Sequence, residues 1–153
     1  MWSNSVSIEI QATPETIFDY LVDFTRHAEW SSSVVGIKLI DGATGQVGAE
    51  YEATESIPIE MTTYARITEV NAPRRIGWES TDKRVFRTNW TFDIEPVTSG
   101  SRLTQSVTFH PLTLFAYRVL YIVRVPIVPN ENLQSLGRIK ERLESGPGAG
   151  TPE

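Results

Sequence analysis

Residues 5–23 read SVSIEIQATPETIFDYLVD, and within this stretch the hydrophobic period changes from two to about 3.6. Apolar and polar residues alternate over 5–12, which predicts a strand with one buried face. Thr13 is a candidate N-cap, and Pro14 suits the first position of a helix over 14–23. The chain therefore passes directly from a half-buried strand into an amphipathic helix.

Strand patterns dominate the middle of the chain. A second short helix is expected over 24–32, which ends in a run of serines. After it, period-two patterns are punctuated by glycine, proline and asparagine, which is typical of strands joined by short turns. Six such strands in succession predict an antiparallel meander. Their expected ranges are 34–41, 47–57, 60–71, 74–81, 84–96 and 101–110.

The C-terminal third is predicted to be helical. Residues 112–128 are largely apolar but too interrupted by charge and proline for a membrane span, which favours a buried helix. Pro126 and Pro129 should kink or interrupt the region. An amphipathic helix is expected from about residue 130 to 145. The tail over 146–153, GPGAGTPE, is expected to be disordered.

The element order β-α-α-β6-α predicts an α+β fold. We expect residues 1–145 to form a single domain in which a curved antiparallel sheet of about seven strands wraps around the long C-terminal helix. Where a helix does not fill the curve of such a sheet, a hollow remains that suits a small ligand.

Composition excludes several classes of function. The 153 residues have a net charge of −5 and no basic block, so nucleic acid is not an expected partner. Cysteine is absent, which fits a reducing compartment, and no secretory leader is expected, so the predicted location is cytoplasmic. No ligand set for a metal and no phosphate-binding loop is found, so neither metal nor cofactor is predicted. The sequence is silent on oligomeric state.

Several motifs together resemble the START-like (SRPBCC) superfamily, especially its polyketide cyclase/dehydrase and lipid-transport branch. They are ATPETIFDYL (12–21), Trp30, VNAPRRI (70–76), GSRLT (100–104) and LGRIKERLE (136–144). The resemblance implies a helix-grip fold with a deep cavity that binds lipids, sterols, polyketides or similar apolar molecules. It implies no shared catalytic motif, because some members cyclise or dehydrate polyketide chains whereas many only bind.

Aromatic residues are the main candidates for ligand binding, because they supply apolar area together with a few donors. For each of them, plain core packing is the alternative. Arg118, inside the apolar segment, would either extend to the surface or neutralise a ligand carboxylate. The full candidate set is Trp30, Tyr51, Tyr64, Trp78, Trp90, Phe92, Gln105, Phe109, Tyr117, Arg118 and Tyr121.

Catalytic candidates are few. Glu55 shares a strand face with Tyr51 and Ala53, so it would reach the hollow if those residues do, and it would then serve as a general acid or base. The alternative is a solvent-facing charge. His110, at the end of the last strand, is the second candidate, and His27 is expected at the surface.

These observations leave three hypotheses about function. The first is a protein that binds a small hydrophobic molecule. The second is a cofactor-independent polyketide aromatase/cyclase or dehydrase, in which the cavity would fold a reactive chain. The third is transient contact with a membrane surface through 112–129.

Overall fold

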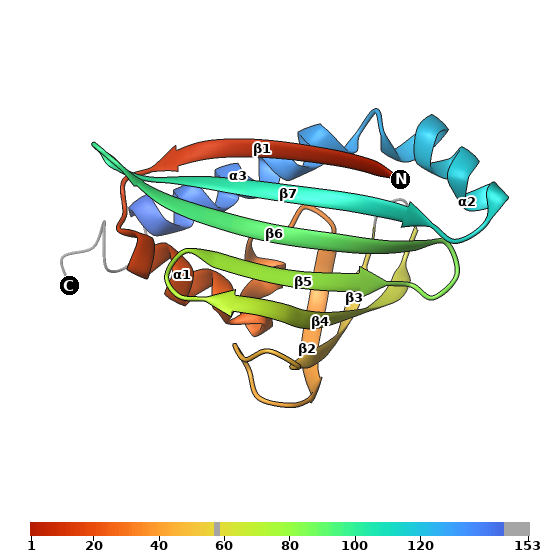
Figure 1. The fold of residues 1–153 in the computed structure, drawn as a ribbon, viewed down its shortest axis with the longest axis horizontal. Coiled ribbons are helices and arrows are strands. Elements are labelled where there is room, and N and C mark those ends of the chain that lie inside the picture. The colour runs from red at the N-terminus through yellow and green to blue at the C-terminus, as the bar shows by residue number, and fades with distance from the viewer. Residues whose placement is uncertain (57–58, 146–153) are drawn as a thin grey trace.

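The computed structural model describes residues 1–56 and 59–145, and the strands of these residues form one antiparallel sheet of seven (Figure 1). The strand order is β1-β7-β6-β5-β4-β3-β2, so the first and last strands of the chain are neighbours. The bounds are β1 Trp2–Ile10, β2 Val34–Asp41, β3 Glu50–Glu55, β4 Met61–Asn71, β5 Arg75–Thr81, β6 Phe86–Val97 and β7 Gly100–Pro111.

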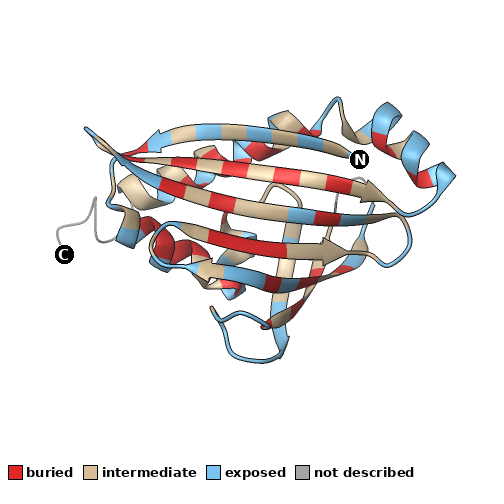
Figure 2. Cartoon of the chain, in the orientation of Figure 1, coloured by how far each residue is buried: buried red, intermediate tan, exposed pale blue. Residues whose placement is uncertain are grey.

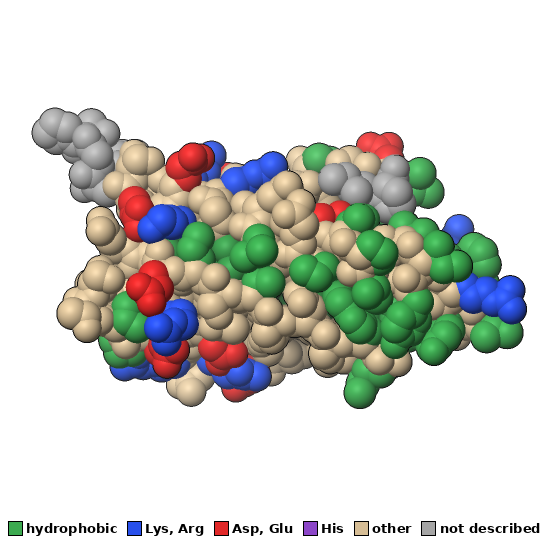
Figure 3. All heavy atoms as spheres, turned by 90° about the horizontal axis from the view of Figure 1, so that it is seen from above, with side chains coloured by type: hydrophobic (Ala, Val, Ile, Leu, Met, Phe, Trp, Pro, Cys, Tyr) green, Lys and Arg blue, Asp and Glu red, His purple; other side chains and the backbone are tan. Residues whose placement is uncertain are grey.

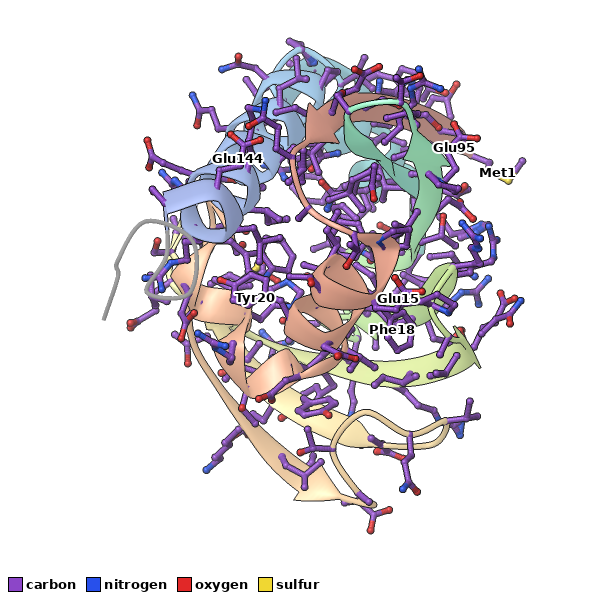
Figure 4. The ribbon with its side chains drawn as sticks, turned by 90° about the vertical axis from the view of Figure 1, so that its left-hand side faces the viewer. Met1, Glu15, Phe18, Tyr20, Glu95 and Glu144 are labelled. Atoms are coloured by element: carbon purple, nitrogen blue, oxygen red, sulfur yellow. The ribbon has the colours of Figure 1, made fainter. Side chains whose placement is uncertain are left out.

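Two groups of helices complete the fold. Helix α1 (Pro14–Val22) and the 3₁₀ helix η1 (Phe24–Glu29) connect β1 to β2. Helix α2 (Leu114–Val119), the π-helical turn η2 (Leu120–Arg124) and helix α3 (Val128–Ser145) follow β7. The sheet curls so strongly that β2 crosses the direction of β5 to β7, and α1 and α3 lie within the curve (Figures 1 and 4). The predicted helix-grip fold is confirmed.

The quoted N-terminal stretch folds as its pattern indicates. Ile10 is buried, whereas the serines of β1 face outward and bond to hydroxyl groups of β7, for example Ser5 Oγ to Ser106 Oγ at 2.8 Å. Thr13 caps α1 by accepting a hydrogen bond from the Thr16 amide at 3.2 Å. The tail over 146–153, predicted to be disordered, lies outside the described residues.

The segment after β7 is helical but not buried. The helix breaks near Pro126, as predicted, and α3 begins two residues earlier than expected, because Pro129 falls in its first turn, where a missing N–H costs nothing. The prediction of a buried helix over 112–128 is wrong: Leu114, Phe115 and Ile122 are 72%, 70% and 74% exposed.

The reason for this exposure is the position of α2 in the fold. It lies beside the end of β7, at one end of the molecule (Figure 1). Only Ala116 of α2 and Leu120 of η2 are fully buried, because no further layer of described residues packs on the outer side of these turns.

The core consists of two apolar clusters. Figure 2 marks the buried residues on the strands and helices. The larger cluster lies beneath α1 and the C-terminal half of α3, with Phe92, Leu136 and Ile139 fully buried. The smaller lies beneath η2 and the start of α3, and contains Phe109 and Leu120. Helix α3 therefore seals one end of the curved sheet, and the α2–η2 region covers the other end less completely.

Two glycines give a test of the backbone with effects of opposite sign. Gly100, the first residue of β7, has φ +148°, and a Cβ there would collide with the Ile10 carbonyl oxygen. Gly137 lies inside α3 with free space around its Cα. We expect Gly100→Ala to lower the free energy of unfolding by about 1–3 kcal/mol. Gly137→Ala should raise it by roughly 0.5–1 kcal/mol. Urea unfolding of both variants checks this, and equal effects of one sign would contradict it.

Candidate functional site

A cavity of about 250 Å³ lies between the inner face of the sheet and the helices. Strands β2 to β7 supply most of its walls. The serine run 31–33 closes one side, and α2, η2 and the first turns of α3 cover the top. Members of both core clusters line it, so the cavity is the space that the two clusters leave between them.

Aromatic rings form the main wall. Trp78 on β5 and Trp90 on β6 are directly paired in register, and their rings stack at 5.9 Å with an angle of 5°. The indole of Trp90 donates to Thr88 Oγ1 at 2.8 Å, so this donor is already satisfied. Phe109 on β7 lies edge-on to Trp90 at 6.4 Å. This wall offers an apolar ligand flat surfaces for stacking.

His27 lies among aromatic rings instead of at the surface. Its ring contacts Trp30 at 4.1 Å, Phe24 at 5.3 Å and Trp78 at 5.8 Å. His27 is one of the residues that line the cavity, and burial lowers the pKa of its imidazole to about 3. The prediction of a surface histidine is wrong, because η1 turns this side chain inward.

Glu55 reaches the cavity from β3. Tyr51 and Ala53 are buried, so the strand face shared by these three residues is the inner one, as the alternation required. The Glu55 carboxylate accepts hydrogen bonds from Thr63 Oγ1 at 2.9 Å and from Ser33 Oγ at 3.3 Å. Glu55 is thus a charged residue of the lining, held in place by two hydroxyl groups.

The other charged groups of the lining are also paired. Arg124 Nη2 lies 2.9 Å from Glu131 Oε1, and both side chains are about 15% exposed. The Asp82 carboxylate accepts from the backbone N–H groups of residues 84, 85 and 86 at 2.9, 2.8 and 3.2 Å. The first pair joins η2 to α3, and the Asp82 hydrogen bonds hold the β5–β6 turn, so both help to fix the cavity lining.

Five of the predicted ligand-binding residues line the cavity, and six do not. Those in the lining are Trp30, Trp78, Trp90, Gln105 and Phe109. Tyr51 is fully buried against Phe24, and Phe92 is buried behind Trp30 and Trp78. Tyr64 lies outside the cavity beneath Lys83, at 4.3 Å from its ring centre.

The remaining predicted residues belong to other faces. His110 follows Phe109 on β7, lies on the opposite face of the strand, and has its pKa lowered by burial and by the nearby Arg87. Tyr117 and Tyr121 are 48% and 41% exposed and contact each other at 4.9 Å. Arg118 lies outside the lining too.

Sequence reasoning missed the side of the helices that faces the cavity. Phe115, Val119 and Val123 line it and are four residues apart, a spacing that was visible in the sequence. Asn132 and Ser135 of α3 line it as well, three residues apart. Ser135 Oγ also accepts from the Ser32 amide at 3.1 Å, which ties the serine run to α3.

The mouth of the cavity is apolar. Ile59, Phe115 and Val123 line the cavity and are also 66%, 70% and 39% exposed. Figure 3 shows apolar side chains gathered at the end of the molecule where α2 lies. In the described part of the chain, every helix is too short or too polar to cross a membrane. The exposed apolar surface is thus continuous with the interior of the site.

Comparison with known proteins places this fold and cavity in a family. The family model described as "Polyketide cyclase / dehydrase and lipid transport" matches residues 1–144. The chain therefore belongs to this family, a branch of the START-like superfamily with a ligand-binding fold. No curated protein matches the sequence.

Solved structures agree in fold at low sequence identity. The Zhui aromatase/cyclase of Streptomyces sp. R1128 has a TM-score of 0.80 at 11% identity, over 97% of this chain and 98% of that one. A protein of Thermus thermophilus has a TM-score of 0.76 at 14% identity, over 92% and 96%. Major latex-like protein 151 of Panax ginseng has a TM-score of 0.70 at 11% identity, over 91% and 95%.

Proposed function

We propose that this protein binds one small hydrophobic molecule, of lipid, sterol or polyketide type, between the sheet and the C-terminal helices. The observation that supports this most directly is the cavity of about 250 Å³ walled by Trp30, Trp78, Trp90 and Phe109. Pockets for drug-sized ligands span roughly 300–1,000 Å³, so a compact ligand of two or three fused rings is favoured. Affinity comes mainly from the apolar area removed from water.

Intrinsic fluorescence gives a direct test, because three of the four tryptophans line the cavity. Titration with naphthalene, a compact apolar probe, should change tryptophan emission with saturation at one molecule per chain. Native mass spectrometry of the purified protein should show a co-purified small molecule if the natural ligand binds tightly. If titration gives no saturable fluorescence change and mass spectrometry shows no bound molecule, the proposal is refuted.

A second candidate function is an aromatase/cyclase or dehydrase acting on a polyketide-like chain. The observation that favours it is Glu55, whose carboxylate is held in the cavity wall by Thr63 and Ser33. The walls would hold a reactive chain in a folded shape, and Glu55, as general base, would take up the proton that the chain gives up when it cyclises. His110 is not assigned a role, because it lies outside the lining.

The test of this second function is turnover of a poly-β-ketone mimic by the wild type and by Glu55→Gln. If the protein is such an enzyme, the wild type should form a cyclised product, and the turnover rate of the variant should be at least about 100-fold lower. Product formation that is equal with and without protein would exclude the enzymatic function and leave the binding function untouched.

Contact with a bilayer surface through residues 112–129 is the third proposal. It is favoured by the exposed apolar side chains at the cavity mouth, since a ligand would then pass from an apolar phase into an apolar cavity. Flotation with phosphatidylcholine vesicles tests it. Ile122→Ser, which removes a 74% exposed side chain outside the cavity lining, should reduce co-flotation. Absence of the wild type from the floating fraction would exclude this contact.

A further inference from the structure

Three side chains of the cavity lining each carry one buried polar atom that has no hydrogen-bond partner. The atoms are His27 Nδ1, Gln105 Oε1 and Asn132 Nδ2. Gln105 and Asn132 are only 3% and 5% exposed. Buried polar groups in folded proteins are almost always hydrogen-bonded, because an unpaired one loses its bonds to water without replacement. All three side chains line the cavity, so their unmet hydrogen-bonding capacity indicates side chains that a bound ligand can satisfy.

The three atoms come from separate elements but share one cavity. His27 belongs to η1, Gln105 to β7 and Asn132 to the first turns of α3. Among the described residues, four buried side-chain atoms lack a partner, and the fourth, Asn4 Oδ1, lies outside the lining. The unpaired groups are therefore concentrated at the proposed ligand site.

The charged groups of the same lining have partners. Arg124 pairs with Glu131, and Glu55 and Asp82 accept the hydrogen bonds described above. No cation in the described part of the lining is left to neutralise an anionic ligand. The groups without partners are an imidazole and two carboxamides, each of which can both donate and accept a hydrogen bond.

We propose that the ligand is an uncharged molecule whose apolar frame bears at least one hydroxyl and one carbonyl group, and that His27, Gln105 and Asn132 hydrogen-bond these groups. This inference rests on the proposed binding function and narrows it. A fatty acid, a phospholipid or another anion is disfavoured, because its charge would be buried without a counter-ion. A bare hydrocarbon leaves the three polar groups unpaired.

A series of probes with one common frame tests this on the wild-type protein. Isothermal titration at pH 7.5 would compare naphthalene, naphthol, an acetylnaphthol and naphthoate. Each neutral polar group should tighten binding on the order of tenfold. Naphthoate should bind at least about tenfold more weakly than naphthol.

Two outcomes would overturn this inference while leaving the binding function intact. In one, naphthalene binds as tightly as the acetylnaphthol; in the other, naphthoate binds most tightly of the four. Failure of all four probes instead overturns the proposed binding function.

Apolar replacements identify the residues. Gln105→Leu, Asn132→Leu and His27→Phe should each reduce the preference for acetylnaphthol over naphthalene on the order of tenfold. Their melting temperatures should stay equal or rise at pH 7.5, because each change removes an unpaired buried polar group. Asn4→Leu is the matched control, because it removes the unpaired group outside the cavity and should leave the preference unchanged. An unchanged preference in all three cavity variants, or an equal loss in Asn4→Leu, contradicts the assignment.

Discussion

An Ala65→Phe variant will bind naphthalene at least about 100-fold more weakly than the wild-type protein, or not at all. Ala65 lies on β4, is 8% exposed, and faces the cavity. A phenyl ring at this position fills much of a cavity of about 250 Å³ and takes the stacking surface that the ligand would use. Because the ring enters existing space, we expect it to cost less stability than the roughly 1–3 kcal/mol of an overpacked core.

Thr62→Phe is the control for this prediction. Thr62 is on the same strand, but it is exposed and points away from the cavity. The same ring is thus added to the same strand on the other face, and naphthalene affinity should stay within about twofold of wild type, as for a surface change. Fluorescence titration and thermal unfolding of both variants give the comparison. A folded Ala65→Phe protein with wild-type affinity would mean that the ligand binds elsewhere.

The order of elements could be predicted because each depends on local chemistry. Alternation, helix caps and turn residues are visible in single stretches, as in the passage from β1 through Thr13 into α1. Alternation also placed Glu55 on the same face of β3 as Tyr51 and Ala53, but it did not indicate which face of the strand points inward.

The boundary between core and cavity could not be predicted from the pattern. Trp90, Phe92 and Ile94 share one face of β6, yet Trp90 lines the cavity whereas Phe92 and Ile94 are buried in the larger cluster. The difference depends on which part of β6 is covered by α1, the helix that packs against this strand. A period-two pattern reports the face of a strand but not what lies above it.

The position of His27 did leave a signal in the sequence. Phe24, His27 and Trp30 are three residues apart, and in a 3₁₀ helix residues at this spacing lie on one side. Phe24 and Trp30 are 1% and 3% exposed, so the side chain between them is carried into the interior with them. The polar neighbours Arg26 and Glu29 suggested a surface segment, but they occupy the other side of η1 and pair with each other at 3.2 Å.

Burial of His27 leads to the second large effect, a loss of stability in acid. An unfolded histidine has a pKa near 6.5, whereas burial lowers the pKa of folded His27 to about 3. Between these pH values the unfolded chain takes up a proton that the folded chain does not. The contribution of His27 to the free energy of unfolding is thus fully present above about pH 6.5. It falls by about 1.4 kcal/mol per pH unit below that, and by on the order of 4 kcal/mol near pH 3.

Guanidinium unfolding between pH 7.5 and pH 4 measures this loss, and His27→Phe isolates it. The carboxylates Glu29 and Glu144, whose pKa values are lowered by their partners, also make the protein less stable in acid. Their contribution is common to both proteins, so the difference between the two profiles reports His27 alone. The profile of His27→Phe should be clearly flatter. That of His110→Gln should change in the same direction but by less, because the pKa of His110 is also lowered but its ring is not enclosed by aromatic rings as that of His27 is. Parallel profiles for wild type and His27→Phe would show that the imidazole is protonated as easily in the fold as in water.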